Sequence, residues 1–310
     1  VPSINGVNTA NTDWQDEVYS SAWTQNLSAS ISNASEKGSY LFSANYIDQN
    51  GLMDNTFYKR FSGRVNSTYN FSKYVRVGEN LMVARWSNRG ADTNGDRGIP
   101  YSAMRQQPAI PVYSADGVFA DPSALLGSDI DNPVQTLYNM RDNTNTSWRV
   151  FGNAYIEIMP IKGLTLKSNV GIEHVQYLSK TLGRNVRPDD PSINRSVSRA
   201  YGEGDTYTWT NTANYLFDLG KDHHFTVLAG TEATKYNFED ISAMRKDYAF
   251  EDSDYMQLGS GSGTQTNGGG KQEWALFSLF GKIDYNFADR YLYSATLRPH
   301  QTPTHAKQHN

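Results

Sequence analysis

Two alternating segments joined by a short polar turn make up residues 60–83, which read RFSGRVNSTYNFSKYVRVGENLMV. The apolar or small residues of the first segment share one face: Phe61, Gly63, Val65 and Tyr69. Its polar residues share the other: Arg60, Ser62, Arg64, Asn66 and Thr68. After a turn at 70–73 the alternation resumes with Val75, Val77, Leu81 and Val83, and Glu79 interrupts this apolar row. Because successive side chains of a strand point to opposite faces, the pattern predicts a β-hairpin with one apolar and one polar face.

The same unit recurs along the chain. Alternating segments stand at 27–31, 40–46, 61–69, 75–83, 150–158, 164–172, 207–217, 225–233, 279–285 and 291–297. They predict ten strands in five hairpins. The turns within the hairpins are short, at 35–38, 70–73, 160–163, 218–221 and 286–289. The predicted loops between the hairpins are longer, at 48–57, 87–146, 178–204 and 239–270.

Composition narrows the class of protein. The 310 residues include 28 Lys and Arg against 32 Asp and Glu, so the net charge of -4 argues against a nucleic-acid partner. Cysteine is absent, which excludes a disulfide scaffold, a thiolate metal site and a cysteine nucleophile. No apolar run approaches the ~18 residues of a membrane helix. A membrane β-barrel remains open, because its alternating strands keep the mean hydropathy low.

Short turns on one side of a sheet and long loops on the other are typical of a transmembrane barrel. We therefore expect an all-β fold: about ten strands of an antiparallel transmembrane β-barrel, with short periplasmic turns and long extracellular loops. A polar face of Ser, Thr, Asn and paired charges suits a wet lumen, and the apolar face suits lipid. A soluble antiparallel sandwich or an extracellular solenoid also alternates and stays an alternative at this point.

Several stretches resemble one family. They read NTDWQDEV at 11–18, QNLSASIS at 25–32, SEKGSY at 35–40, YIDQNG at 46–51, YKRFSGRV at 58–65, GNAY at 152–155, KGLTLKS at 162–168, FGKIDYNF at 280–287 and DRYLYSATLR at 289–298. Taken together, they are similar to the TonB-dependent outer-membrane receptors of the starch-utilisation (SusC/RagA-like) type. The resemblance runs in order over residues 11–298.

The resemblance implies a function in the bacterial outer membrane. Such a receptor imports an oligosaccharide or a peptide across a lipid-embedded barrel of twenty-two strands. Its full-length form carries a plug domain, works with a SusD-like surface lipoprotein and is energised by the TonB complex. We expect about ten of these strands in this sequence, and neither the plug nor the TonB segment. We therefore expect an internal part of a receptor: a lead-in segment at 1–24, partial barrel at 25–298 and a non-native or disordered tail at 299–310.

The predicted long loop at 87–146 is the best candidate for ligand binding. Aromatic rings stack on sugars or peptides, and Arg fixes polar groups. Six such residues lie in or beside this loop: Trp86, Tyr101, Arg105, Tyr113, Tyr138 and Arg141. The alternative is that these side chains only pack the loop onto the mouth of the barrel.

Other motifs fit cofactor sites poorly. The Asp92–Gly98 stretch resembles a Ca²⁺ loop, but Arg97 takes the place of its glycine and Ala103 that of its bidentate Glu. Residues 268–271, GGGK, lack the Ser or Thr of a phosphate loop and predict a flexible external loop. Adjacent His223 and His224 would point to opposite faces of a strand. We expect no metal, no cofactor and no catalytic set, and hence no enzyme.

Two functions from different classes fit the sequence. The first is part of an importer, in which these residues supply barrel wall and loops. The second is a surface-exposed β adhesin or binding protein without transport. The importer makes a facing prediction: Val150, Ala154 and Ile156 contact lipid, whereas Arg149, Asn153 and Glu157 point inward.

Overall fold

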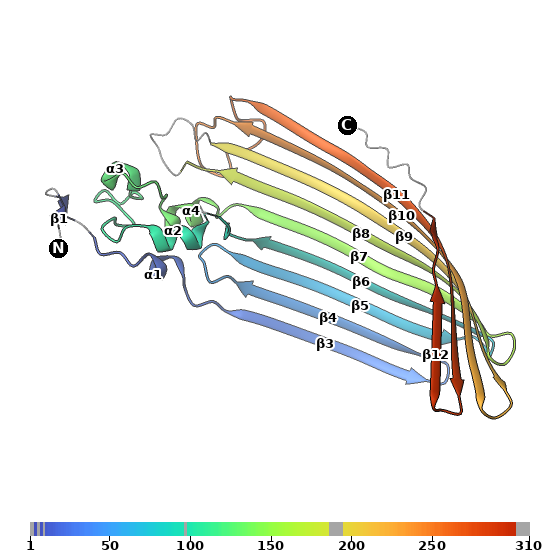
Figure 1. Cartoon of the computed structure of the whole chain (residues 1–310). Coiled ribbons are helices and arrows are strands. Elements are labelled where there is room, and N and C mark those ends of the chain that lie inside the picture. The colour runs from blue at the N-terminus through green and yellow to red at the C-terminus, as the bar shows by residue number, and fades with distance from the viewer. Residues whose placement is uncertain (1–2, 5–6, 9, 96–97, 186–194, 302–310) are drawn as a thin grey trace.

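In the computed structural model, one antiparallel sheet of long strands dominates the chain (Figure 1). The structure describes residues 3–4, 7–8, 10–95, 98–185 and 195–301. The long strands follow chain order from one end of the sheet to the other: β3 (Thr24–Ser35), β4 (Gly38–Asn50), β5 (Phe57–Asn70), β6 (Val75–Arg89), β7 (Thr144–Ile158), β8 (Leu164–Gly183), β9 (Ser196–Leu219), β10 (His223–Lys246), β11 (Gln265–Phe287) and β12 (Tyr291–Leu297). The ten predicted strands and the all-β class are thus confirmed, and the sheet is open between β3 and β12.

Short strands complete the sheet pairing. β1 (Ser3–Ile4) pairs with β2 (Val7–Asn8) apart from the main sheet. β13 (His300–Gln301) pairs with Phe277 and Ser278 of β11, so the predicted tail begins with residues that extend the ladder. The remainder of that tail, 302–310, lies outside the described residues.

Two of the predicted loops are too long. β8 extends as far as Gly183, and β9 already begins at Ser196. β10 and β11 pair continuously up to Arg245 and Gln265. The prediction failed because apolar alternation stops in these outer strand ends while the backbone hydrogen bonds continue. The same error placed residues 268–271 in a flexible loop, whereas the structure sets them in β11 opposite β10. The predicted loops 48–57 and 87–146 match the observed gaps of 51–56 and 90–143 within a few residues.

Alternate positions of each strand divide the sheet into an apolar face and a polar face. On β7, Ala154 and Ile156 lie on the apolar face and are exposed, whereas Asn153 and Glu157 lie on the polar face and are half-buried. Polar-face side chains are covered because they bind one another across strands. Glu157 forms ion pairs with Arg76 at 3.3 Å and with Lys167 at 3.1 Å.

Glu79, which interrupts the apolar row in the sequence, has a local partner. The hydroxyl of Ser67, its register neighbour on β5, donates to the carboxylate at 2.6 Å and 2.7 Å. The apolar face therefore carries one polar pair at this point.

Strand lengths differ across the sheet. β3–β6 have 12 to 15 residues, whereas β8–β11 have 20 to 24. A tilted strand needs only about 9–11 residues to cross a bilayer. The extra residues lie toward the long loops, where the apolar face of β9–β11 changes to Glu203, Lys235 and Lys271.

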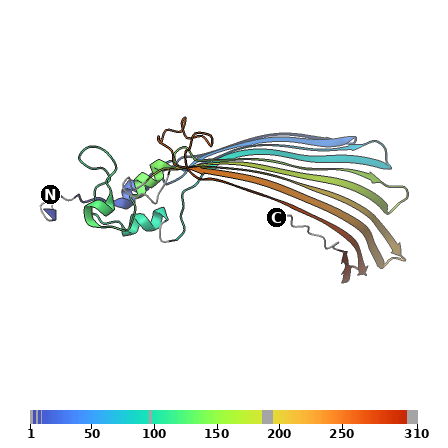
Figure 2. The ribbon, with the colours of Figure 1, turned by 90° about the horizontal axis from the view of Figure 1, so that it is seen from above.

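Aromatic rings cover glycines on the polar face. Four directly paired positions combine a glycine with a ring: Gly78 with Tyr155, Gly202 with Tyr177, Gly204 with Phe238 and Gly230 with Phe280. A Cβ at these glycines would lie 2.4–2.9 Å from a ring atom, so each ring covers the glycine backbone of the neighbouring strand. Rings over bare backbone are a known way to stabilise a curved sheet, and Figure 2 shows this sheet curving along its length.

The long 90–143 loop folds into helices that the strand pattern did not predict. These are α2 (Ile99–Arg105), α3 (Pro122–Leu126) and α4 (Pro133–Asn139). α2 and α4 pack with α1 (Trp14–Val18) at one end of the sheet (Figure 1), and Leu126 of α3 packs against their core. A buried cluster joins them: Trp14, Val18, Ile99, Ala103, Ile110, Val112, Ala120 and Leu137. Within the described residues, no helix is both long and apolar enough to cross a membrane.

Candidate functional site

An aromatic strip lies on the folded 90–143 loop, made of Tyr113, Phe119, Tyr138 and Arg141. The rings of Tyr113 and Phe119 stack with centroids 4.9 Å apart, and Phe119 lies 5.4 Å from Tyr138. The Arg141 guanidinium lies 3.9 Å from the centroid of the Tyr138 ring. Tyr113 and Tyr138 are 52% and 46% exposed, so this strip offers ring faces and one cation to a ligand.

Local hydrogen bonds hold the two ends of the strip. Tyr113 and Phe119 form an isolated bridge around a turn in which Ser114 N–H donates to the Val118 carbonyl at 2.8 Å. The Ser114 hydroxyl also donates to Asp116 at 2.6 Å and holds the pKa of that carboxyl below its usual value. At the other end, the Asn132 amide oxygen caps α4 by accepting from Val134 and Gln135.

The six predicted ligand residues separate into three groups. Tyr113, Tyr138 and Arg141 come together in the aromatic strip. Tyr101 and Arg105 form their own pair in α2, with the guanidinium 5.0 Å from the ring centroid and 3.8 Å from Asp129.

The sixth residue, Trp86, lies in β6 rather than in the loop, on the polar face opposite Arg60 and Ser147. Sequence reasoning missed Phe119, which joins the two tyrosines. The sequence signal for it was an aromatic six residues after Tyr113, across a glycine turn at Gly117.

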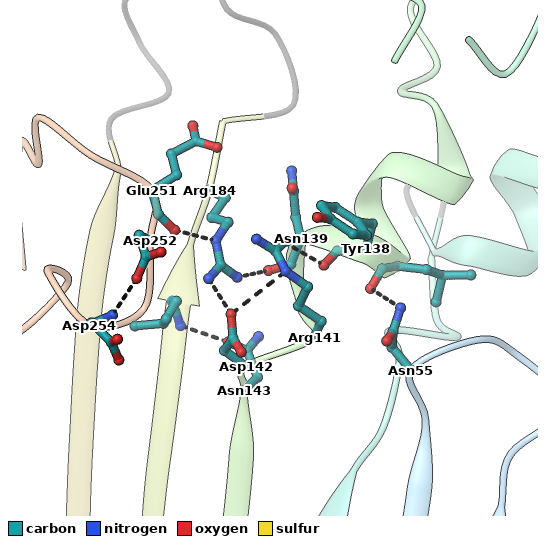
Figure 3. A network of polar contacts seen from close by, with 12 residues as sticks. Asn55, Tyr138, Asn139, Arg141, Asp142, Asn143, Arg184, Glu251, Asp252 and Asp254 are labelled. Atoms are coloured by element: carbon teal, nitrogen blue, oxygen red, sulfur yellow. Dashed lines mark hydrogen bonds and ion pairs between the residues drawn. The ribbon is translucent and has the colours of Figure 1, made fainter. Parts of the chain in front are cut away.

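A buried arginine ties this loop to its neighbours (Figure 3). The Arg184 side chain has no exposed surface and pairs with the Asp142 carboxylate. Its guanidinium also donates to the carbonyl of Asn139 at 2.5 Å and to that of Glu251 at 2.9 Å. Arg184 thus connects α4, the end of β8 and the 247–264 loop, and it fixes the segment that carries Arg141.

A second apolar cluster lies beside this arginine. It consists of Leu182, Val197, Tyr248 and Met256, and it packs the 247–264 loop against β8 and β9. Burial raises the pKa of the Tyr248 phenol, and its hydroxyl has no hydrogen-bond partner among the described residues. The cluster is therefore held by packing.

The described residues of the candidate metal and phosphate motifs form local hydrogen bonds or belong to strands. Asp92 accepts from the backbone of Asn94 at 3.0 Å, while Asp96 and Arg97 of the candidate Ca²⁺ loop lie outside the described residues. His223 bonds Tyr285 at 2.8 Å and His224 bonds Asp218 at 2.6 Å, so these adjacent residues of β10 point to opposite faces of the sheet, as predicted. In the part of the chain that the structure describes, no three His, Cys, Asp or Glu side chains gather as metal ligands.

Comparison with known proteins supports the family resemblance. No family model matches the chain. TonB-dependent receptor P3 of Formosa agariphila is 28% identical over 305 residues, and TonB-dependent receptor SusC of Bacteroides thetaiotaomicron is 25% identical over 321 residues. These alignments cover 93% and 94% of this chain. A structure of the RagAB peptide transporter matches 96% of the chain with a TM-score of 0.80 and 26% identity.

The resemblance to SusC/RagA-like TonB-dependent receptors is confirmed. The chain spans 29% and 30% of the length of these two curated receptors, and 34% of the matched RagAB chain. Within the SusC/RagA-like fold, these residues correspond to barrel strands and the loops that join them. The relatives are named as receptors and a transporter, and none of these names denotes an enzyme.

Proposed function

We propose that this sequence supplies barrel wall and external loops to an outer-membrane importer of the SusC/RagA type, which takes up oligosaccharides or peptides. The observation that carries the proposal is the agreement of the ten-strand sheet with the RagAB transporter over 96% of the chain. The large hydrophobic side chains exposed on the apolar face support it, because water would not favour such a surface.

In this proposal the apolar face contacts outer-membrane lipid and the polar face lines the lumen. The exposed apolar side chains include one from each of five strands: Leu27, Phe61, Val170, Trp209 and Leu279. The polar face satisfies its own charges by pairing, as Arg149 and Glu173 do at 2.6 Å. A lipid face of alternating apolar residues and a lumen of paired polar residues are the general pattern of membrane barrels.

The aromatic strip is the proposed ligand contact of the external loops. RagAB is named as a peptide importer, and SusC-type receptors by resemblance take oligosaccharides. Rings next to a guanidinium suit either class. In the full receptor we propose a SusD-like lipoprotein over this outer surface and energy supplied through TonB.

The test uses the full gene product that carries this sequence. It is expressed in a bacterial host, membranes are fractionated, and the protein is run on gels with and without boiling. We expect it in the outer-membrane fraction, soluble only in detergent, with heat-modifiable migration. Recovery in the soluble fraction without detergent would contradict the importer and favour a surface adhesin.

The ligand contact is tested in the same protein. Tyr138→Ala removes the ring that joins Phe119 to Arg141, so we expect weaker uptake or binding of the transported compound. Tyr19→Ala is the control, because this tyrosine is similarly exposed, at 38%, and lies outside the strip. Equal effects of the two substitutions would show that the aromatic strip does not contact the ligand.

A further inference from the structure

A second aromatic surface lies on the polar face of the sheet, at the ends of β8–β11 nearest the long loops. It is made of Tyr177, Phe238, Tyr236 and Trp274, and we refer to it as the ring platform. Tyr236 and Trp274 are paired across β10 and β11 and stack with centroids 5.3 Å apart at 23°. Tyr177 and Phe238 reach toward each other from β8 and β10, 6.4 Å apart at 19°.

The platform is flat because the strand between its rings has no side chains there. Gly202 and Gly204 of β9 lie opposite Tyr177 and Phe238, and both glycines are buried beneath these rings. A Cβ at Gly202 would come within 2.4 Å of the Tyr177 ring. Each of these rings therefore rests one face on the β9 backbone and turns the other face away from the sheet.

Ring faces remain available to a ligand. Tyr177 is 36% exposed and Trp274 is 43% exposed. From β8 to β11 the platform crosses three strand spacings, or roughly 14 Å. Beside it, the exposed Gly268–Gly270 backbone of β11 leaves the surface bare. A surface of this extent suits a ligand made of several linked rings better than a single small molecule.

The neighbours of the platform are almost all neutral. Polar-face positions around it hold hydroxyls, amides and small residues: Ser179, Ala200, Thr206, Thr208, Thr234, Ser242 and Gln272. Glu173, opposite Thr206, is charged but paired with Arg149 at 2.6 Å, and a second charged neighbour is Asp240, at the edge nearest Gly270. Within the described residues its carboxylate has no ion-pair partner, so both oxygens can accept hydrogen bonds from a ligand.

We infer that the ring platform binds a neutral oligosaccharide, with sugar rings stacked on Tyr177, Phe238 and Trp274 and a pair of sugar hydroxyls donating to Asp240. The inference rests on the proposed function, since it names the class of compound that this wall of the lumen would receive. Flat rings suit the apolar faces of sugars, and surrounding hydroxyls suit their edges. A peptide would bring charged groups and backbone amides for which this surface offers few partners.

The test measures binding by the purified full gene product in detergent. The probes are neutral hexasaccharides of glucose, xylose and mannose, and a tryptic digest of casein, each titrated by calorimetry. We expect at least one hexasaccharide to bind. Trp274→Ala should weaken that binding about tenfold or more, a typical loss for a central aromatic contact. Trp274→Phe should restore most of it, because a ring returns.

Trp209→Ala is the matched control. Trp209 lies on the apolar face and is exposed, so its loss should leave saccharide binding unchanged. Three results would each overturn the inference. Trp274→Ala could leave saccharide binding unchanged, no hexasaccharide could bind, or the Trp274 substitutions could change the binding of casein peptides alone. Failure of import is separately visible: a protein that binds saccharide through Trp274 but is absent from the outer membrane contradicts the proposed function alone.

Discussion

The aromatic rings over polar-face glycines predict that alanine substitutions at two strand glycines, Gly230 on the polar face and Gly63 on the apolar face, will differ in their effect on stability. An alanine at position 230 would place its Cβ 2.4 Å and 2.5 Å from ring atoms of Phe280 and 2.9 Å from the Asn211 carbonyl oxygen. An alanine at position 63 would meet no atom within 4 Å. Both lie inside long strands, β10 and β5, and neither has a positive φ.

The magnitude follows from two terms. Replacing a strand glycine by alanine stabilises by about 0.5–1 kcal/mol, because the unfolded chain loses freedom. This gain is common to both variants. Forcing a ring away from a packed position costs about 1–3 kcal/mol, and only Gly230→Ala incurs that cost. We therefore expect Gly230→Ala to be less stable than Gly63→Ala by about 1–3 kcal/mol.

The assay is urea unfolding of the refolded full gene product in detergent micelles, followed by tryptophan fluorescence. A double-mutant cycle with Phe280→Ala isolates the cause, because Gly230→Ala should lose its penalty once the ring is gone. Equal stability of the two alanine variants would refute the reasoning. A penalty at position 230 that persists without Phe280 would also refute it.

Three further predictions concern single side chains. Arg184→Gln removes the fully buried guanidinium that pairs with Asp142 and bonds the carbonyls of Asn139 and Glu251. It should cost about 3–5 kcal/mol and speed hydrogen exchange in the 90–143 loop, whereas Arg105→Gln, at an exposed pair, should change neither. Tyr248→Phe removes a buried hydroxyl that has no partner among the described residues, so stability should hold or rise by about 1 kcal/mol in the same urea assay. Ala154→Arg should cost about 2–4 kcal/mol in a bilayer, and Asn153→Arg less; the reverse order would invert the two faces.

Much of the sheet could be predicted because period two is a local signal. The segments near Phe61 and Val150 alternate so regularly that strand, turn and face follow from neighbouring residues alone. The signal fails at the outer ends of β9–β11. There Glu203 and Lys235 occupy apolar-face positions, and only the register with distant strands keeps the backbone extended.

The candidate site depended more on distant contacts. Capping residues followed by proline, Asp121-Pro122 and Asn132-Pro133, mark the starts of α3 and α4 and could have been used. The meeting of Tyr113 with Tyr138 through Phe119 could not be derived, because it depends on how the loop folds on its own core. The pairing of Tyr177 with Phe238 likewise depends on the register of three strands, β8, β9 and β10, which are joined by a loop and a short turn.

The measurement that tests the central claim most directly is solvent mapping of β7. The sequence contains no cysteine, so single substitutions from Asn153→Cys to Glu157→Cys can be made in a full gene product freed of other cysteines. Each variant is reconstituted in vesicles and treated with a water-soluble maleimide and a lipid-soluble one. We predict that positions 154 and 156 react only with the lipid-soluble reagent, and positions 153 and 157 with the water-soluble one. Water-soluble labelling of both sets would contradict a barrel wall embedded in lipid.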